Sequence, residues 1–412
     1  MSKGIQDSPF QEIDLCPACS NSEFDRIYEF GNVPLAGYFP LPGKSEEKFL
    51  IPMELRSCKE CQLVQINPDV NDDLLFADYR YVSSVGMQSH FDSFADWFEK
   101  SHFADQNSTI LEIGCNDGPL LDSLTKKGYR PIGIDPASNI VRQASQKGLN
   151  VICDFFNLES VEAHQLVNTC DVLISCNSFA HISDIGLVAK SVARALKPTG
   201  VFIVEIQSLY DLVKSKAFDF VYHEHKYYYS IVSISNLLRR HGMYLVDGME
   251  IDTHGGSMRL VFSKSKNDES EILKKMINKE NSVDLTPTAI QIAIVSFMKE
   301  IQKLKIFLQS SSKENQVCVG VGASGRANML LNYLLPEAKV IDAVYDESPE
   351  RIGREMALSE IPVKGLAEAS ELGPANVLVL AWNYSEVLIS KWSNQKSTFV
   401  IPLPEFTVVR NG

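Results

Sequence analysis

The sequence predicts an α/β protein in three parts: a small metal-binding domain at residues 1–82, a doubly wound core at 83–262 and a second doubly wound domain at 263–412. Three observations predict this fold class. Two Cys-x-x-Cys pairs lie near the amino terminus, a strand with a glycine turn begins near Ser108, and a second glycine turn begins at Gly320. At 412 residues, the chain is also too long for one ordinary core.

The charge and the ends of the chain restrict its partners. A formal net charge of -13 disfavours nucleic acid, because binding to phosphates depends on lysine and arginine. The first residues, MSKGIQDSPF, carry no apolar signal region, and no stretch has the roughly 18 to 20 apolar residues that span a bilayer. We therefore expect a cytoplasmic protein with no nucleic-acid or membrane partner, either a monomer or a weak dimer.

Four cysteines predict a structural zinc ion. Cys16 and Cys19 form one pair, Cys58 and Cys61 the other, and the spacing within each lets both sulfurs reach one tetrahedral ion. Two pairs complete a four-thiolate shell with no open position, so the metal is expected to be structural rather than catalytic. The other five cysteines lie in or beside apolar runs and are predicted to be buried thiols: Cys115, Cys153, Cys170, Cys176 and Cys318.

The first glycine turn predicts an adenosine-containing cofactor. STILEIGCNDG is an apolar strand and a turn, and a second strand ends in Asp135, where a carboxylate can hold two ribose hydroxyls. Gly114 and Gly118 allow close approach of a ligand, and the absence of a P-loop lysine argues against a nucleoside triphosphate. Taken alone, the turn also fits a dinucleotide.

The pattern E-x-G-x-N-x-G from Glu112 to Gly118, which contains Gly114 and Asn116, resembles that of the class I methyltransferases. This resemblance implies a Rossmann-like core that binds S-adenosylmethionine, with Asp135 on the ribose. It also implies that Asp154, after the strand VIC, contacts the adenine. The fourth predicted strand, DVLISC, ends in a polar tip that begins at Asn177, which we assign to the same cofactor site.

The segment Tyr222–Ser230, YHEHKYYYS, combines two imidazoles, a carboxylate and four phenols. Burying so many polar groups is costly unless each finds a partner, so the natural place for this segment is a cleft that faces a polar substrate. The catalytic chemistry is predicted here.

Five motifs in order resemble the sugar C-methyltransferases of deoxysugar biosynthesis, such as the tetronitrose and mycarose enzymes. They are FAHISDI, FDFVYHEHKYYYS, HGGSMRL, GVGASGRANMLLNY and VLVLAWNY. The resemblance covers nearly the whole chain. It implies a zinc domain, a methyltransferase core and a C-terminal Rossmann-like domain, with a nucleoside-diphosphate keto sugar bound in the cleft.

Methylating a carbon requires removal of a proton next to a carbonyl, which a 4-keto sugar offers at C3. A neutral imidazole suits this task, and the resemblance implies His225 as the base, with Tyr222, Glu224 and His181 around the sugar. Glu224 is expected to set the tautomer of His225 or to share its role. Further candidates for contact with the sugar are Tyr79, Tyr81 and His254.

The turn from Gly320 to Gly325 is a G-x-G-x-x-G, so a nicotinamide oxidoreductase is a rival interpretation. The resemblance instead implies that this turn borders the diphosphate, with Arg326 and Arg259 as candidate phosphate contacts. A sugar O- or N-methyltransferase and a nonenzymatic zinc-bearing binding module also stay open. Ahead of the turn, apolar residues between Ile290 and Leu308 recur at steps of four and three, which predicts a helix that packs on a domain face.

Overall fold

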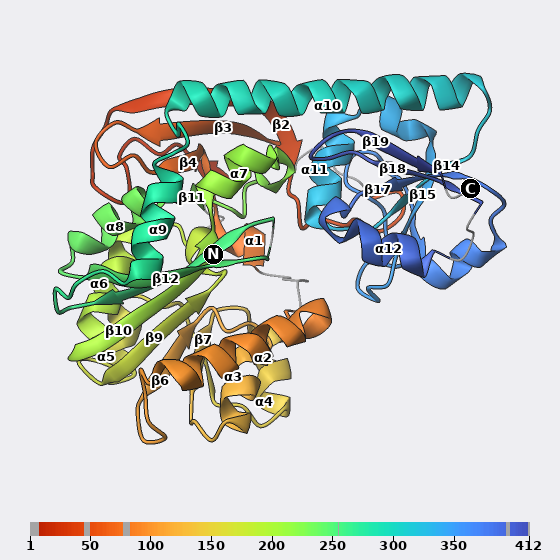
Figure 1. Cartoon of the computed structure of the whole chain (residues 1–412). Helices are drawn as coiled ribbons and strands as arrows, with labels where there is room; N and C mark the ends of the chain where they lie inside the picture. The colour runs from red at the N-terminus through yellow and green to blue at the C-terminus, as the bar shows by residue number, and fades with distance from the viewer. Residues whose placement is uncertain (1–7, 45–49, 77–82, 254, 393–395, 411–412) are drawn as a thin grey trace, which may run out of the picture.

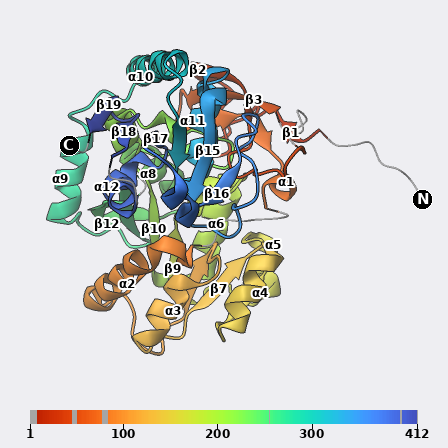
Figure 2. The same ribbon diagram turned by 90° about the vertical axis from the view of Figure 1, so that its right-hand side faces the viewer.

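The computed structural model describes residues 8–44, 50–76, 83–253, 255–392 and 396–410. Three main sheets follow one another along the chain (Figure 1). The core helices α2, α3 and α4 lie at the bottom of the molecule in both views, and α10 lies at the top, where it runs across the molecule in Figure 1 and is seen nearly end-on in Figure 2.

The core is a seven-stranded sheet in the order β12-β13-β10-β9-β6-β7-β8. Its strands from β6 to β10 are parallel, while β13 runs antiparallel to both β10 and β12. The strands are β6 (Ile110–Ile113), β7 (Ile132–Asp135), β8 (Val151–Cys153), β9 (Cys170–Cys176), β10 (Leu196–Gln207), β12 (Tyr244–Ile251) and β13 (Ser257–Ser263). Because β7 and β9 flank β6 on opposite sides, a crevice opens at their carboxyl ends, where such sheets bind ligands.

Helices cover both faces of the core sheet. The first, α2, packs on α3 beside the sheet, and a cap begins several of the others: Ser208 for α7 and Ser230 for α8 each accept a backbone N–H through the side chain. The helices of this part are α2 (Ser84–Ser101), α3 (Pro119–Lys126), α4 (Ser138–Gln146), α5 (Leu158–Ala163), α6 (Ile185–Ala195), α7 (Leu209–Ser215) and α8 (Ile231–Arg239).

The N-terminal sheet contains a strand from much later in the chain. Its order is β11-β4-β3-β2, all antiparallel, and β11 is the dipeptide Tyr227–Tyr228 of the histidine and tyrosine segment. The others are β2 (Phe24–Pro34), β3 (Leu50–Cys58) and β4 (Val64–Asn67), while β1 (Phe10–Gln11) pairs separately with β5 (Asp69–Val70), just before α1 (Asp72–Phe76). The predicted catalytic segment is therefore tied to the N-terminal sheet.

The C-terminal part is a six-stranded sheet in the order β16-β15-β14-β17-β18-β19, parallel except for the last pair. Its strands are β14 (Cys318–Val321), β15 (Ile341–Asp346), β16 (Val363–Gly365), β17 (Asn376–Val379), β18 (Thr398–Ile401) and β19 (Thr407–Arg410). Its helices include α11 (Gly325–Tyr333) and α12 (Ser385–Lys391). The second glycine turn follows β14 and leads directly into α11.

The predicted amphipathic helix is α10 (Pro287–Lys313), which begins after the cap Thr286 with proline at its first position. It buries the predicted stripe in a core that also contains residues of β2, β3, β4 and the C-terminal sheet. The N-terminal and C-terminal sheets thus share one apolar core, bridged by α10. The preceding α9 (Glu271–Glu280) packs instead on β12 of the core sheet.

Two further results concern the predictions. Cys153 is exposed, contrary to the prediction that it is buried, because it ends β8 at the edge of the core sheet; the other four cysteines outside the pairs are buried. Among the helices that the structure describes, none has the length and apolar character needed to cross a membrane.

Candidate active site

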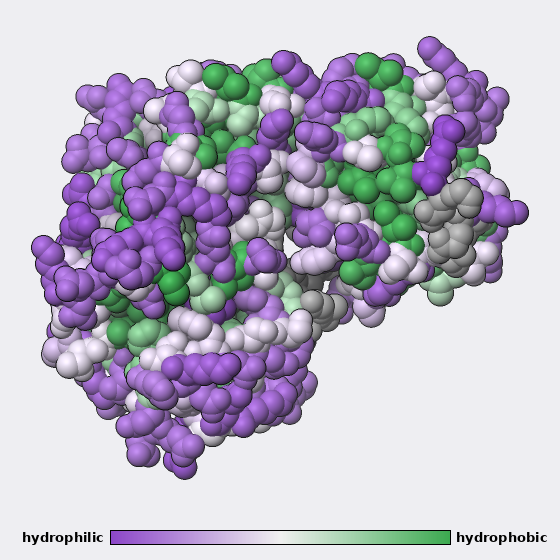
Figure 3. Space-filling model, in the orientation of Figure 1, coloured by the Kyte–Doolittle hydropathy of each residue, from purple (hydrophilic) through white to green (hydrophobic). Residues whose placement is uncertain are grey.

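A cavity of about 1510 Å³ lies between the core sheet and the C-terminal part. Its walls come from the carboxyl ends of β6, β7 and β9, from the carboxyl ends of β14 and β15, and from the segments 35–41 and 220–225. The surface is hollowed where the lower part of the molecule meets the C-terminal part (Figure 3). Because pockets for one small molecule usually measure about 300 to 1000 Å³, this cavity has room for two ligands.

The first glycine turn and Asp135 form one end of the cavity. Gly114 has a φ of +68°, and a Cβ there would lie 2.4 Å from the Cβ of Ser178, so only glycine fits. Both carboxylate oxygens of Asp135 accept backbone N–H groups, from Asn116 at 3.0 Å and Ala137 at 2.9 Å. Burial raises the pKa of Asp135, and these two hydrogen bonds oppose the rise. The carboxylate is thus fixed in place with lone pairs left for a ligand.

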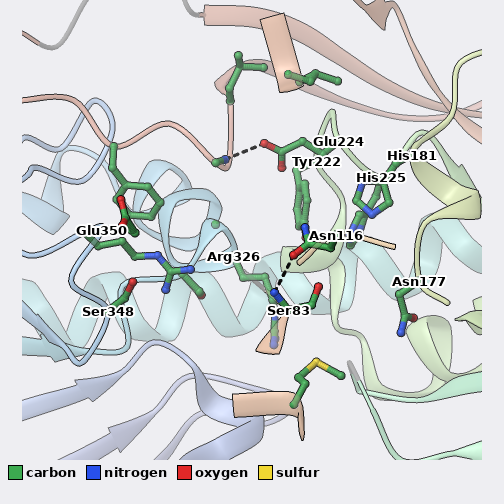
Figure 4. A pocket seen from close by; sticks show the side chains of 18 of the residues that line it. Ser83, Asn116, Asn177, His181, Tyr222, Glu224, His225, Arg326, Ser348 and Glu350 are labelled. Atoms are coloured by element: carbon green, nitrogen blue, oxygen red, sulfur yellow. Dashed lines mark hydrogen bonds between the residues drawn. The ribbon is translucent and has the colours of Figure 1, made fainter. Parts of the chain in front are cut away.

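Two asparagines complete this end. The side chain of Asn116 accepts the backbone N–H of Ser83 at 3.0 Å (Figure 4). The side chain of Asn177 donates to Glu205 at 3.1 Å. Burial alone would raise the pKa of Glu205, but hydrogen bonds and charge from His90 and Arg259 outweigh it and lower the pKa to about 2. A buried carboxylate therefore holds Asn177 at the cavity wall.

Three residues predicted for the cofactor site do not line the cavity. Glu112 is buried in β6, where burial, followed by the charges of Asp135 and Asp117, holds its pKa well above the usual range. Gly118 precedes α3 with a φ of +80° and serves the turn. Asp154 pairs with His164 at 3.0 Å. Their assignment to the cofactor stays a prediction.

The four cysteines gather in one cluster. Their sulfur atoms all lie within 4.8 Å of one another, with Cys16 and Cys61 3.6 Å apart and Cys19 and Cys58 3.5 Å apart. A tetrahedral ion with Zn–S bonds of about 2.3 Å separates its sulfurs by about 3.8 Å, close to these distances. The cluster therefore fits a structural zinc ion, as the spacing predicted, and all nine cysteines of the chain are free thiols.

The histidine and tyrosine segment supplies the middle wall of the cavity. His225 Nδ1 lies 3.1 Å from the carbonyl oxygen of Phe220, and Nε2 lies 2.9 Å from the hydroxyl of Tyr222. Because a carbonyl oxygen only accepts, Nδ1 carries the hydrogen, and the neutral ring keeps its lone pair on Nε2, which accepts from Tyr222. The ring of His181 crosses that of His225 at 86°, with centroids 4.9 Å apart (Figure 4).

Glu224 is held from the N-terminal part. One oxygen of its carboxylate accepts the backbone N–H of Gly37 at 2.8 Å, and a Cβ at Gly37 would lie 2.7 Å from that oxygen. Burial raises the pKa of Glu224 to about 7, a rise that this hydrogen bond opposes. The tautomer of His225 is therefore set by the backbone carbonyl of Phe220, whereas Glu224, predicted for that task, bonds to Gly37.

Family models match the chain in three adjoining stretches. Residues 16–76 match a "Putative zinc binding domain", residues 80–247 a "Methyltransferase domain" and residues 252–404 a "C-methyltransferase C-terminal domain". The C-methyltransferase NovU of Streptomyces niveus is 27% identical over 413 residues, which cover 96% of this chain and 97% of that protein. These matches identify the chain as an S-adenosylmethionine-dependent methyltransferase that is similar to a C-methyltransferase over nearly its whole length.

Other relatives are similar to parts of this methyltransferase. The ubiquinone biosynthesis O-methyltransferase of Hydrogenovibrio crunogenus is 27% identical over 168 residues, 38% of this chain and 70% of its own length. The crystal structure of magnesium protoporphyrin IX methyltransferase (ChlM) from Synechocystis PCC 6803 with bound SAH is 19% identical. The match covers 44% of this chain and 84% of the chain in that crystal structure, and the TM-score is 0.35.

The second glycine turn of this methyltransferase packs closely on its neighbours. A Cβ at Gly322 would lie 2.7 Å from that of Ala381, and one at Gly325 would lie 3.2 Å from the carbonyl oxygen of Ala36. Close packing therefore accounts for these two glycines without a nicotinamide. Asp346 ends β15, and one of its oxygens accepts the N–H of Ala323 at 2.7 Å.

The two arginines predicted to contact phosphate have protein partners. Arg259 lies in β13, where it pairs with Glu205 at 2.8 Å and stacks on Phe94, outside the cavity lining, so this prediction is wrong. The sequence does not show which face of β13 it occupies. Arg326 does line the cavity, but its guanidinium pairs with the buried Asp219 at 2.7 Å and stacks on the ring of Phe220.

Some functional residues carry no signal in the sequence. Gly37 and Phe220 contribute backbone atoms. The buried carboxylate of Asp219 pairs with Arg326, and the indole N–H of Trp382 donates to that carboxylate. Asp219 lies inside the motif FDFVYHEHKYYYS, which is the one available hint. Tyr79, Tyr81 and His254, predicted to contact the sugar, lie outside the residues that the structure describes.

Proposed function

We propose that this C-methyltransferase transfers the methyl group of S-adenosylmethionine to C3 of a nucleoside-diphosphate 4-keto deoxysugar, through an enolate formed by His225. The observation that carries this proposal is an imidazole with a defined tautomer, beside a phenol and a carboxyl group, in a cavity large enough for two ligands. The similarity to sugar C-methyltransferases over nearly the whole chain supports the substrate class.

The end of the cavity at β6, β7 and β9 suits the methyl donor. Asp135 would hold the ribose hydroxyls, and Asn116 and Asn177 are the polar side chains beside it. When bound, S-adenosylmethionine supplies an electrophilic methyl group on a sulfonium. The side chains of these three residues are each fixed by hydrogen bonds to the chain, so they are ready to orient the cofactor without rearrangement.

The base works through His225 Nε2. The carbonyl of Phe220 holds the hydrogen on Nδ1, so the neutral ring can accept the C3 proton only at Nε2. The hydroxyl of Tyr222 occupies this lone pair in the structure, and the sugar takes its place there. The hydroxyl that is released can then donate to the keto oxygen, which gains negative charge as the proton leaves.

Glu224 and His181 support this step. A pKa of about 7 leaves the Glu224 carboxyl group partly protonated near neutrality, so it can donate a hydrogen bond to the enolate oxygen. His181 lines the same wall beside His225 and can bind a sugar hydroxyl. Zinc at the four cysteines has no part in the reaction, because a closed thiolate shell offers no open position.

Proton NMR tests the proposal. The protein is mixed with S-adenosylmethionine and a panel of nucleoside-diphosphate 4-keto-6-deoxy sugars, and a new methyl singlet on a C3 that has lost its proton is the expected result. A methyl group on oxygen or nitrogen would instead establish an O- or N-methyltransferase. With NADH or NADPH added to the same mixtures, oxidation of the nicotinamide without methyl transfer would favour the oxidoreductase.

The base is tested by His225→Asn. A general base typically contributes about 10² to 10⁴ in rate, so kcat should fall by that factor. The control is His241→Asn, a histidine that follows α8 and does not line the cavity; its kcat should match that of the parent. Full activity in His225→Asn would refute the assignment of the base.

A further inference from the structure

An ion pair between two parts of the chain lies beside Phe220, whose carbonyl oxygen contacts the proposed base. Two nitrogens of Arg326, in the first turn of α11, donate to one oxygen of Asp219 at 3.0 and 2.7 Å. The indole N–H of Trp382 donates to the same oxygen at 2.9 Å. The third nitrogen of Arg326 donates to Asn383 at 2.6 Å, so the guanidinium is held by the protein itself.

This pair is almost completely buried. Asp219 has a relative exposure of 0% and Arg326 of 8%, although the arginine reaches the cavity wall. A buried ion pair is a weak source of stability, because apolar side chains of similar volume often serve as well. Its position therefore points to a task other than stability, namely fixing the geometry of the segment that contains Asp219.

The next residue after Asp219 holds the base. Phe220 ends the short helix η3 (Phe218–Phe220), and its carbonyl oxygen accepts the hydrogen on His225 Nδ1. The guanidinium of Arg326 lies 3.6 Å from the centre of the Phe220 ring. From the other side, the hydroxyl of Tyr228 in β11 reaches the same carbonyl at 3.3 Å. Backbone and ring of Phe220 are thus both fixed.

We propose that Asp219 and Arg326 are positioning residues that set the orientation and tautomer of His225 through the carbonyl of Phe220. The C-terminal part thereby controls the base without touching the reacting atoms. If the pair is broken, η3 can shift, the Nδ1 hydrogen loses its acceptor, and Nε2 no longer presents a lone pair to the sugar. This inference rests on the proposed role of His225.

The tautomer can be measured without any substrate. In protein labelled with ¹⁵N-histidine, the imidazole nitrogen shifts distinguish Nδ1–H from Nε2–H, and the spectrum of His225→Asn assigns the signal. We expect the Nδ1–H form in the parent and a mixture or the Nε2–H form in Arg326→Met. Arg326→Lys keeps the positive charge but loses the two parallel N–H donors of the guanidinium, so its fraction of the Nδ1–H form should lie between those of the parent and Arg326→Met. The control is Glu337→Gln, whose ion pair with Lys305 lies outside the cavity lining, and it should match the parent.

Kinetics give the second measurement. A displacement of about 1 Å can cost about 10² in rate, so kcat of Arg326→Met should fall about 10- to 100-fold. The Kd for S-adenosylmethionine should stay within twofold of the parent, because the cofactor end lies on other strands. An unchanged tautomer with unchanged kcat would overturn the inference, and so would a loss of cofactor affinity as large as the loss of kcat.

A milder variant covers the case in which Arg326→Met does not fold. Trp382→Phe removes one donor to Asp219 while leaving both charges paired, and it should change the tautomer and kcat in the same direction by a smaller factor. No change in either would overturn the inference. If His225→Asn keeps full methyl transfer, the proposed base is wrong, whereas the tautomer shift still decides whether the pair controls the imidazole.

Discussion

Replacing Glu224 by glutamine should make the protein more stable above pH 7. The carboxyl group lies in the cavity wall, where burial raises its pKa from an ordinary 4.5 to about 7. Glutamine has the same shape, and its side-chain oxygen can still accept the N–H of Gly37. The substitution therefore removes the cost of a buried charge and leaves the packing unchanged.

The size of the effect follows from the difference between the two pKa values. The difference, 7 minus 4.5, at about 1.36 kcal/mol per pKa unit, corresponds to about 3 kcal/mol, and screening by water in the cavity makes this an upper value. Between pH 4.5 and 7 the folded carboxyl group keeps its proton and the unfolded one does not. Stability from this group is thus fully present below pH 4.5 and is lost as the pH rises to 7.

The assay is urea unfolding of parent and Glu224→Gln at pH 4.5 and pH 8.5. We expect free energies of unfolding that agree at pH 4.5 and differ by up to about 3 kcal/mol in favour of the variant at pH 8.5. The control is Glu371→Gln at the exposed end of η5 (Leu366–Glu371), which should change neither value. A difference that is the same at both pH values, or a variant less stable at pH 8.5, would refute the reasoning.

Two further predictions concern the bound groups. Cys58→Ser should lose the zinc ion, measured as metal per chain, and with it a binding free energy on the order of 10 kcal/mol; Cys153→Ser, outside the cluster, should keep about one ion. Asp135→Asn should raise the Kd for S-adenosylmethionine about 10- to 100-fold in calorimetry, because hydrogen bonds to a charged group contribute about 1.5 to 3 kcal/mol. The exposed Asp342→Asn should leave that Kd unchanged, and an equal effect of both would argue against Asp135 as the ribose ligand.

The sequence predicts those features of the fold and site that depend on residues close together in the chain. The zinc cluster can be predicted because each cysteine pair needs only a local turn. The strand before Gly114 can be predicted from its run of apolar residues. The hydrogen-bond partner of Glu224 cannot be predicted from the sequence, since Gly37 lies 187 residues earlier in the chain. The predicted phosphate contact of Arg259 is wrong because nothing local in the sequence indicates that this side chain faces Glu205 inside the core. Long-range polar pairs depend on the packing of whole sheets.

The proposed catalytic segment, Tyr222–Ser230, is held by more than one of the three parts. Its strand β11 has only two residues, which is too short to be stable alone, and it pairs with β4 of the zinc-bearing part. Lys226, next to the base, is buried and pairs with Asp69 at 2.6 Å and Asp72 at 2.7 Å. The N-terminal part therefore fixes one end of the segment, and the ion pair of Arg326 fixes the other.

This arrangement connects the cysteine cluster, which offers no open metal position, to the segment that contains the proposed base. Cys58 and Cys61 share an apolar core with Tyr227, which lies in β11, and with Tyr229, which follows it; the proposed base His225 precedes the same strand. Loss of the metal should loosen the hairpin of β3 and β4, and with it β11, while leaving the cofactor end on β6 and β7 intact. Cys58→Ser protein that stays folded should therefore lose kcat much more than it loses affinity for S-adenosylmethionine. Equal losses of both would show that the zinc only holds the fold together.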